Sequence, residues 1–372
     1  MKILMVSTDE SIIREGSEAY LRMREYGNLF SELHIILFSK KKGTERRIRE
    51  NVFVYPVYSI CRFFVPFKAF FKYGRVIEEE GSDWRITTQD PFETGIVGFL
   101  MKTFSGIFWQ AQIHTDFLSP FFFRQSFLNK IRVFAAKLII WKADRIRVVS
   151  ERIKKSLVEI GLEGKKIDVL PISIKAEEIE NIPISFNLKE KYPGMDFIIL
   201  MVSRITPEKN IRSAVAAFFE ALKKRPKMKL VIAGEGPSLP DLKRETEKRG
   251  ILKDVEFLGE LTHEKAISAM KTADLFLSSS VYEGYGMTAV EAAAAGCPVL
   301  ITDTGIAGEI IKDGESGTVV PVGSVLKMAE AIEVLAGNKE KREKMAERAK
   351  ESVKNLMSKD EYLNKFKEIL EK

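Results

Sequence analysis

The sequence predicts an α/β protein of two domains, each with a doubly wound, mostly parallel sheet. Short runs rich in Ile, Val and Leu alternate with helical patterns twice along the chain. The length of 372 residues exceeds what one hydrophobic core usually serves. Residues 181–194 hold two prolines and show no clear period, which is typical of a linker. We therefore expect an N-terminal domain over 1–180, a linker over 181–194 and a C-terminal domain over 195–357.

Apolar runs bounded by turn residues define the expected strands. In the first half these strands cover 2–8, 33–39, 52–58, 84–89, 108–114, 145–150 and 167–171, with helices over 18–28, 91–103 and 126–142. In the second half they cover 197–203, 229–233, 255–259, 274–279, 298–302 and 317–321. The helix after 197–203 has one apolar face, formed by Ile211, Ala214, Val215, Phe218, Phe219 and Leu222. The charged C-terminal stretch ends in Tyr362, Phe366 and Leu370, again at helical spacing.

Composition indicates a soluble globular protein of the reducing cytoplasm. The two cysteines, Cys61 and Cys297, lie far apart and form neither a disulfide framework nor a thiolate metal site. The N-terminal apolar run is too short for a signal peptide, and no apolar run reaches about 18 residues, so we expect no membrane-spanning helix. Nothing in the pattern indicates a nucleic-acid partner.

Basic and aromatic residues concentrate in the first half of the chain. Residues 1–180 hold 29 Lys/Arg against 23 Asp/Glu, which is +6 of the total +7, and 16 of the 25 phenylalanines lie between Phe53 and Phe134. Aromatic groups interleaved with cations suit an anionic membrane surface, which would make the protein peripheral on the inner face of the membrane. A Phe-rich core with solvated basic flanks explains the same pattern. Both interpretations stay open at this point.

A glycine-rich turn between a strand and a helix, SSSVYEGYGMTAVEAAAAGCP from 278 to 298, is the most informative segment. Gly284 and Gly286 let the backbone approach a ligand, and a helix opening near Met287 directs free N–H groups at an anion. Glu283 and Glu291, separated by seven residues, could accept hydrogen bonds on either side of that anion. A nucleotide sugar, with a diphosphate between two polyhydroxylated groups, fits this arrangement.

Further candidate residues follow neighbouring strands of the second half. Arg204 follows the strand 197–203 and Lys209 opens the next helix, so both lie where ligands of doubly wound sheets collect and could clamp a diphosphate. Each residue alone would usually be a solvated surface cation. Gly234, in the turn GEGP, and Leu258, near the end of the strand 255–259, add weaker support because glycine turns after strands are routine.

Two candidates come from the first half. His114 ends the strand 108–114, where a neutral imidazole could donate to or accept from a sugar hydroxyl; a buried structural histidine is the alternative. Gly16 lies in the loop after the first strand, where backbone N–H groups could face a ligand. The chain lacks the dinucleotide-binding, P-loop and G-x-S-x-G patterns, and no third ligand completes a metal site with His114 and Asp116.

The motifs SRITPEKN, VIAGEGP, VEFLGEL and SSSVYEGYGMTAVEAAAAGCPVLITDTG together resemble the family-4 retaining glycosyltransferases of the GT-B fold, over about residues 198–320. The resemblance implies two Rossmann-like domains across a deep cleft, with a last helix, about 358–372, that returns to the first domain. It also implies a UDP- or GDP-linked sugar donor, no further cofactor, no metal, and an acceptor that is a glycan or a lipid-linked molecule.

The resemblance implies a role for each candidate. Glu291 would hold the ribose and Glu283 the transferred sugar. Arg204 and Lys209 would stabilise the departing diphosphate, assisted by N–H groups around Gly286, Met287 and Thr288. His114 would contact the sugar's primary hydroxyl. The chain departs from the family pattern in four places: the lone Gly16, Asn210 where glycine is common, and the segments 171–174 and 304–309.

Two alternatives to a transferase remain open. A nucleotide-sugar epimerase on the same fold would convert the donor without an acceptor, and a non-catalytic subunit would bind nucleotide without transfer. The donor's base and sugar, the acceptor, the linkage and the oligomeric state are not determined by the sequence.

Overall fold

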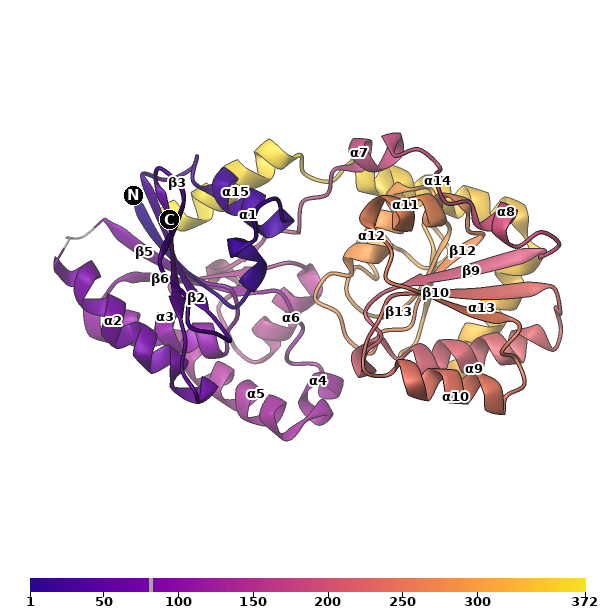
Figure 1. Cartoon of the computed structure of the whole chain (residues 1–372), viewed down its shortest axis with the longest axis horizontal. Coiled ribbons are helices and arrows are strands. Elements are labelled where there is room, and N and C mark those ends of the chain that lie inside the picture. Colours follow the sequence, from indigo (N-terminus) through magenta and orange to yellow (C-terminus); the bar gives the residue numbers. More distant parts are fainter. Residues whose placement is uncertain (80–82) are drawn as a thin grey trace. The chain divides into compact units, whose positions relative to one another are not determined.

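A computed structural model describes residues 1–79 and 83–372, except for the side chains of Arg62 and of residues 74–79. The chain forms two compact units (Figure 1). The first consists of Met1–Pro171 together with Asp360–Lys372, and the second of Ile172–Lys359.

The first unit is built on an eight-stranded sheet in the order β3-β4-β2-β1-β5-β6-β7-β8. Its strands are β1 (Lys2–Ser7), β2 (Glu32–Phe38), β3 (Arg46–Arg49), β4 (Val52–Val57), β5 (Trp84–Thr88), β6 (Phe108–Ile113), β7 (Arg145–Val148) and β8 (Ile167–Val169). All neighbours pair in parallel except β3, which runs antiparallel to β4. Strand order proceeds outward from β1 on one side and from β5 on the other, so the sheet is doubly wound.

Helices cover both faces of this sheet (Figure 1). They are η1 (Glu10–Ile13), α1 (Glu18–Tyr26), η2 (Arg62–Phe64), α2 (Val65–Glu79), α3 (Glu93–Ser105), α4 (Pro120–Gln125), α5 (Phe127–Ile139), η3 (Ile140–Lys142), α6 (Glu151–Glu159), η4 (Gly164–Lys166) and α15 (Lys359–Glu371). Several begin at side-chain caps; for example, Ser17 and Ser150 accept hydrogen bonds from N–H groups of the first turns of α1 and α6.

The C-terminal helix α15 packs on the first unit, as expected. In Figure 1 it lies beside α1. Phe366 is fully buried and stacks on Tyr26 with ring centroids 4.7 Å apart. The hydroxyls of Tyr26 and Tyr362 are 2.9 Å apart. The apolar side chains at the end of the chain thus join the core of the first unit. The stacked residues Tyr26 and Phe366 are 340 positions apart in sequence.

The second unit has a six-stranded, fully parallel sheet in the order β11-β10-β9-β12-β13-β14. Its strands are β9 (Phe197–Val202), β10 (Met228–Ala233), β11 (Val255–Gly259), β12 (Leu275–Ser278), β13 (Val299–Thr302) and β14 (Thr318–Val320). Its helices are α7 (Ala176–Asn181), α8 (Leu188–Lys191), η5 (Pro207–Lys209), α9 (Ile211–Leu222), α10 (Leu239–Lys248), α11 (His263–Thr272), α12 (Met287–Ala294), α13 (Val325–Gly337) and α14 (Lys339–Lys354). Helices α9, α10 and α13 lie on one face of the sheet, and α11 and α12 on the other (Figure 1).

Two expectations differ from the structure. Strand β3 was not predicted, because its sequence, RRIR, has no apolar run; it pairs along one edge only, where charged residues are common. The division between the units falls after Pro171, earlier than residue 180. The segment 181–194, expected to be a linker, belongs to the second unit: Leu188 is buried and its N–H donates to Thr272 Oγ1 at 3.0 Å.

Candidate functional site

Most predicted site residues lie at the carboxyl ends of four adjacent strands in the second unit, β11, β10, β9 and β12. Leu258 lies in β11, Gly234 follows β10, Arg204 and Lys209 follow β9, and Glu283 follows β12. Strand order moves outward from β9 in one direction and from β12 in the other, so the switch point lies between these two strands. Ligands of open α/β sheets bind at such a point.

Lys209 and Glu283 form an ion pair at this switch point. The Lys209 ammonium lies 2.5 Å from Glu283 Oε1, and both side chains are 18% exposed. Ser280 Oγ donates to the same carboxylate oxygen at 2.7 Å. Ser279 Oγ donates to the carbonyl of Lys209 at 2.9 Å, and Val281 N–H donates to the carbonyl of Glu208 at 2.8 Å. These bonds tie the loop after β9 to the loop after β12, which places the cation and the carboxylate before any ligand arrives.

Arg204 is more exposed than Lys209. Its side chain is 76% exposed, and its guanidinium lies 3.4 Å from Glu208 Oε1. The same oxygen accepts a hydrogen bond from Thr206 Oγ1 at 2.6 Å. Glu208 was not predicted, although its spacing of four residues from Arg204 indicates a pair on one turn of chain. Because most of the guanidinium is exposed, it can turn toward an incoming anion.

Asn210 explains one departure from the family pattern. Its backbone is left-handed, with φ 46° and ψ 39°, directly before α9. Among the residues that the structure describes, it is the only non-glycine with a positive φ. Asparagine tolerates this conformation better than most residues, so it can occupy a position where glycine is common.

The turn between β12 and α12 has the conformation that an anion site requires. Gly286 precedes the helix with φ 96°, which a residue with a side chain rarely adopts. Met287 and Thr288 are the first two helical residues, so their N–H groups have no acceptor within the helix. Glu291, one turn further on, is 19% exposed, and its Oε1 lies 3.9 Å from His263 Nδ1. The turn is held from behind by Ile306 N–H, which donates to the Tyr285 carbonyl at 3.0 Å.

Gly234 is required by backbone packing. A Cβ atom there would lie 1.9 Å from the carbonyl oxygen of Ser203, and one on Gly236 would lie 2.3 Å from that of Ile205. The two glycines thus let the loop after β10 contact the loop that carries Arg204. Leu258 is the extra residue of a β-bulge, because β10 pairs Ile232 with Phe257 and then Ala233 with Gly259.

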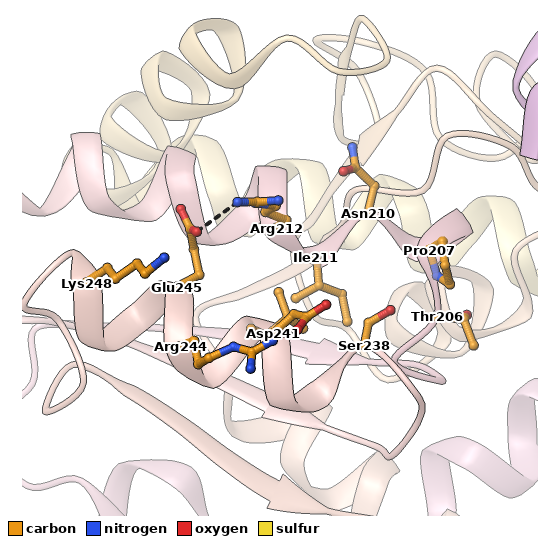
Figure 2. A pocket seen from close by; sticks show the side chains of 11 residues that line it. Thr206, Pro207, Asn210, Ile211, Arg212, Ser238, Asp241, Arg244, Glu245 and Lys248 are labelled. Carbon is orange, nitrogen blue, oxygen red and sulfur yellow. Dashed lines mark hydrogen bonds and ion pairs between the residues drawn. The ribbon is translucent and has the colours of Figure 1, made fainter.

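A pocket lies beside this site, between η5, the start of α9, and α10 (Figure 2). Its lining includes none of the predicted site residues. Four of its charged groups form two ion pairs, Arg212 with Glu245 and Arg244 with Asp241. Arg212, which lines this pocket, can therefore serve as a control for Arg204 in mutagenesis.

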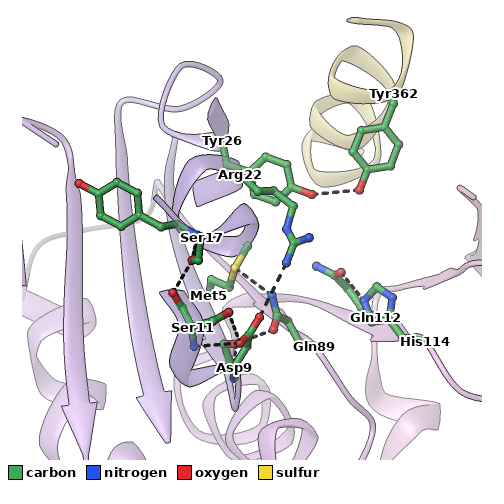
Figure 3. Close-up of polar contacts among 12 residues, drawn as sticks. Met5, Asp9, Ser11, Ser17, Arg22, Tyr26, Gln89, Gln112, His114 and Tyr362 are labelled. Carbon is green, nitrogen blue, oxygen red and sulfur yellow. Dashed lines mark hydrogen bonds and ion pairs between the residues drawn. The ribbon is translucent and has the colours of Figure 1, made fainter. Parts of the chain in front are cut away.

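In the first unit, His114 follows β6, which ends at Ile113. Its Nε2 lies 3.0 Å from Gln112 Oε1. Figure 3 shows this contact as a dashed line between the two side chains. The same oxygen accepts from Arg147 Nη1 at 2.9 Å, and Gln112 Nε2 donates to Thr87 Oγ1 at 2.8 Å. Because the Gln112 oxygen is an acceptor for Arg147, His114 Nε2 must donate to it, which leaves Nδ1 as an acceptor.

The surroundings of His114 keep its ring neutral. Burial lowers the pKa of His114 to about 3, and the positive charges of Arg147 and Arg22 act in the same direction. Arg147, Gln112 and Tyr362 were not predicted. Gln112 could have been predicted, because it precedes His114 by two positions, the spacing of side chains on one face of a strand. Arg147 comes from the neighbouring strand and Tyr362 from the C-terminal helix, so neither has a local signal.

This low pKa predicts a pH dependence of stability. Below pH 6.5 the unfolded chain binds a proton on His114 that the folded chain does not bind until about pH 3. Stability should therefore fall as the pH drops through this interval, by up to about 1.4 kcal/mol per pH unit from this group. His114→Gln, which keeps a donor for Gln112, should show a shallower slope in urea unfolding at pH 7, 5.5 and 4. Parallel slopes for the two proteins would contradict a neutral His114 in the folded chain.

Gly16 lies in the exposed loop between η1 and α1, with φ 80°. Asp9 caps η1, which precedes this loop: its carboxylate accepts from both N–H and Oγ of Ser11. Gly16 and His114 belong to the first unit, and the other predicted residues belong to the second.

Part of the second unit matches a known family model. Residues 186–352 match the family model of group 1 glycosyl transferases. The chain is 35% identical over 164 residues to an α-D-kanosaminyltransferase of Streptomyces kanamyceticus, covering 44% of this chain and 42% of that protein. It is 38% identical over 115 residues to an α-monoglucosyldiacylglycerol synthase of Streptococcus pneumoniae, covering 31% and 26%. The chain thus spans less than half the length of either relative.

Solved structures resemble the whole chain. HepE of Anabaena, in complex with UDP and glucose, superposes with a TM-score of 0.75 at 18% identity, covering 100% of this chain and 99% of that one. A sucrose-phosphate synthase from Thermosynechococcus elongatus has a TM-score of 0.78 at 17% identity, covering 99% and 98%. These similarities show the fold, which is of the GT-B type with two Rossmann-like domains, as expected.

Proposed function

We propose that this chain is a retaining glycosyltransferase that moves a sugar from a nucleoside-diphosphate sugar to an acceptor hydroxyl. The observation that carries the proposal is the Lys209–Glu283 pair, which lies at the switch point of the sheet beside the open N-terminus of α12. This arrangement lies within the part of the chain that matches group 1 glycosyl transferases. The family match and the named relatives support the transferase class.

We assign the donor to the carboxyl ends of β9 to β12. The diphosphate binds the N–H groups of Met287 and Thr288 and the side chains of Arg204 and Lys209. Glu291 accepts hydrogen bonds from the ribose and Glu283 from the transferred sugar. Gly286, Gly234 and Leu258 let the backbone approach the nucleotide. UDP and GDP are both candidate carriers; the HepE structure contains UDP.

The chemistry follows from these positions. The bond from the sugar C1 to the diphosphate oxygen breaks while a bond to the acceptor oxygen forms on the same face, which retains the configuration. The acceptor's proton passes to the leaving diphosphate. Arg204, Lys209 and the dipole of α12 stabilise the charge that develops there, and the cations supply this stabilisation without a metal. Because Glu283 already holds Lys209 in place, little reorganisation is needed when the donor binds.

We assign the first unit to the acceptor and to the sugar. His114 presents Nδ1 as an acceptor for a sugar hydroxyl, and the loop at Gly16 offers backbone N–H groups. The acceptor is a glycan or a lipid-linked molecule. Both cysteines are free, which suits a cytoplasmic location. No helix in the described part of the chain is long and apolar enough to cross a bilayer.

A nucleotide screen tests the donor site. Nucleoside diphosphates and their sugar conjugates should raise the unfolding temperature, since a ligand at 100 times its Kd adds about 2.7 kcal/mol. Donor that is consumed only when acceptor is present supports transfer, conversion of donor alone supports an epimerase, and binding without turnover supports a non-catalytic subunit. A protein that no nucleoside diphosphate stabilises would refute the site.

Glu291 gives a second, sharper prediction. If its carboxylate binds the ribose, wild-type protein should prefer the ribonucleoside diphosphate over its 2′,3′-dideoxy analogue by about tenfold or more, as expected for a charge-assisted hydrogen bond. Glu291→Gln should lose most of that preference while keeping its affinity for the dideoxy analogue. Titration calorimetry with both nucleotides measures this, and a preference that survives in the variant would contradict the assignment.

A further inference from the structure

The outer surface of α4, α5 and η3 carries an unusual number of large apolar side chains. Three of them, Phe127, Phe134 and Leu138, are 77%, 67% and 61% exposed. The exposed apolar residues of this surface, called here the α4–α5 surface (residues 120–142), are Phe121, Phe123, Phe127, Leu128, Ile131, Phe134, Leu138 and Trp141. Contiguous apolar groups on this scale usually mark a binding surface.

The folding of the first unit does not account for this surface. The core-facing side of α5 consists of Asn129, Val133, Ala136 and Ile139, which are buried. The residues at positions 127, 131, 134, 138 and 141 follow one another at spacings of four and three, so they form a separate stripe on the helix. A helix with one face in the core would ordinarily place polar groups on the other. The stripe is therefore available to a partner outside the unit's own core.

The charge of the surface indicates what covers it. Residues 120–142 include five cations and no Asp or Glu. Arg132 is paired with Glu93 from α3, whereas Arg124, Lys130, Lys137 and Lys142 are exposed. Lys130 extends over the ring of Phe123, with its ammonium 5.8 Å from the ring centroid. Long cationic side chains around an apolar stripe can keep their charges at lipid headgroups while the apolar groups enter the bilayer.

We propose that the α4–α5 surface docks on a bilayer containing anionic lipids, and that the acceptor is held in that bilayer. The second part rests on the proposed transferase function. The link between them is short: β6 ends at Ile113, His114 follows, and α4 begins at Pro120. Six residues span at most about 20 Å, and buried Phe117 anchors the loop between the ends. A membrane under α4 and α5 would thus lie close to the residue assigned to the sugar, which favours a lipid-linked acceptor.

Sedimentation with vesicles tests the docking directly. The full chain should bind vesicles of mixed phosphatidylglycerol and phosphatidylcholine, bind pure phosphatidylcholine at least about tenfold more weakly, and dissociate as salt rises from about 0.05 to 0.5 M. The combined variant Phe127→Ser, Phe134→Ser and Leu138→Ser should lose about tenfold or more in affinity. Lys130→Gln and Lys137→Gln should each reduce binding about fivefold at low salt.

A matched control separates this surface from general hydrophobicity. Leu326, in the second unit, is 69% exposed, close to Leu138. Leu326→Ser should leave vesicle binding unchanged, whereas Leu138→Ser should weaken it. Equal binding of all vesicles by wild type and triple variant would overturn the proposal. So would sedimentation equilibrium showing that the wild type self-associates through this surface, that the triple variant is monomeric, and that neither binds vesicles.

The two proposals fail in different ways. Vesicle binding needs neither donor nor acceptor, so its loss in the triple variant can be measured whether or not transfer occurs. Stabilisation of the triple variant by UDP or GDP should equal that of the wild type, because none of the substituted residues belongs to the second unit. Vesicle binding without nucleotide binding would refute the transferase and keep the docking surface; the reverse result would do the opposite.

Discussion

Arg204→Ala is expected to weaken the binding of a nucleoside diphosphate about 10- to 150-fold. A charge-assisted hydrogen bond contributes about 1.5 to 3 kcal/mol, and each 1.4 kcal/mol is a factor of ten in Kd. Lys209→Ala should have an effect of similar size. The loss should be larger for the diphosphate than for the monophosphate of the same nucleoside, because the cations are assigned to the diphosphate. Calorimetric titration of each variant with both nucleotides measures the difference.

Arg212→Ala is the matched control for Arg204. Arg204 and Arg212 are 76% and 75% exposed, and each is paired with a glutamate whose side chain is 14% exposed. Arg212 lines the neighbouring pocket of Figure 2 and is not assigned to the donor. Its replacement should change nucleotide affinity less than about twofold, since exposed ion pairs contribute little. Equal effects of Arg204→Ala and Arg212→Ala would show a general field of positive charge and would contradict a specific diphosphate contact.

Lys209 requires one further comparison. Removing its ammonium leaves the partly buried Glu283 carboxylate with Ser280 as its remaining side-chain partner in the described contacts. Part of the loss in Lys209→Ala could therefore come from the unpaired carboxylate. The double variant Lys209→Ala, Glu283→Gln separates the two effects. If the diphosphate contact dominates, the double variant should bind the diphosphate no better than Lys209→Ala alone.

Phe366→Ala is expected to lower the free energy of unfolding of the first unit by about 3 to 5 kcal/mol. Phe366 is fully buried and contacts the rings of Tyr26, Phe30 and Tyr362, with centroids 4.7, 6.3 and 6.4 Å away. Its loss would leave a cavity between α15 and the sheet. The three tryptophans of the chain, Trp84, Trp109 and Trp141, all belong to the first unit, so tryptophan fluorescence during urea unfolding reports on that unit.

Phe127→Ala provides the control for Phe366→Ala. The substitution is chemically the same, but Phe127 is 77% exposed, so the change should stay within about 0.5 kcal/mol. Similar urea midpoints for the two variants would mean that α15 is not part of the cooperative core of the first unit. Unfolding of the two units need not be a single transition, so the fluorescence curve is to be compared with the circular dichroism of the whole chain.

Local sequence patterns predicted helices and strands well where successive side chains share one environment, either buried or exposed. The buried parallel strands of both sheets are continuous apolar runs, so their positions follow from composition and turn residues. Strand β3 escaped because charged residues on an edge strand leave no apolar run. Helix α8 escaped because its four residues are too few to show a period.

The candidate site was predicted in part. Arg204, Lys209 and Glu283 stand at recognisable positions after strands. The structure places them beyond the carboxyl ends of the adjacent strands β9 and β12, with Gly286 at the start of α12 and Glu291 within it. The structure adds a packing reason for Gly234 that the sequence did not show, because a Cβ atom there would strike the Ser203 carbonyl. Gln112, Arg147 and Tyr362 were missed because they come from two strands and the final helix.

The phenylalanine clusters show the same limit. In the run of Phe121, Phe122 and Phe123, the middle ring is buried and its neighbours are exposed. The pattern alone was compatible with both a core and a surface. Side chains on successive positions of a helix point in different directions, so the location of the helix on the sheet decides which of them are covered.

The alternation of strands and helices, the division into two domains and the glycine-rich turn that opens α12 could all be predicted from the chain alone. These features depend on backbone periods and on residues within a few positions of one another. Three features became visible only in the folded chain. Lys209 pairs with Glu283, 74 residues away; Arg147 orients Gln112 and through it His114; and α5 leaves an apolar stripe exposed. The physical reason is that such contacts depend on strand order and helix placement, which bring distant segments together and leave no local period in the chain.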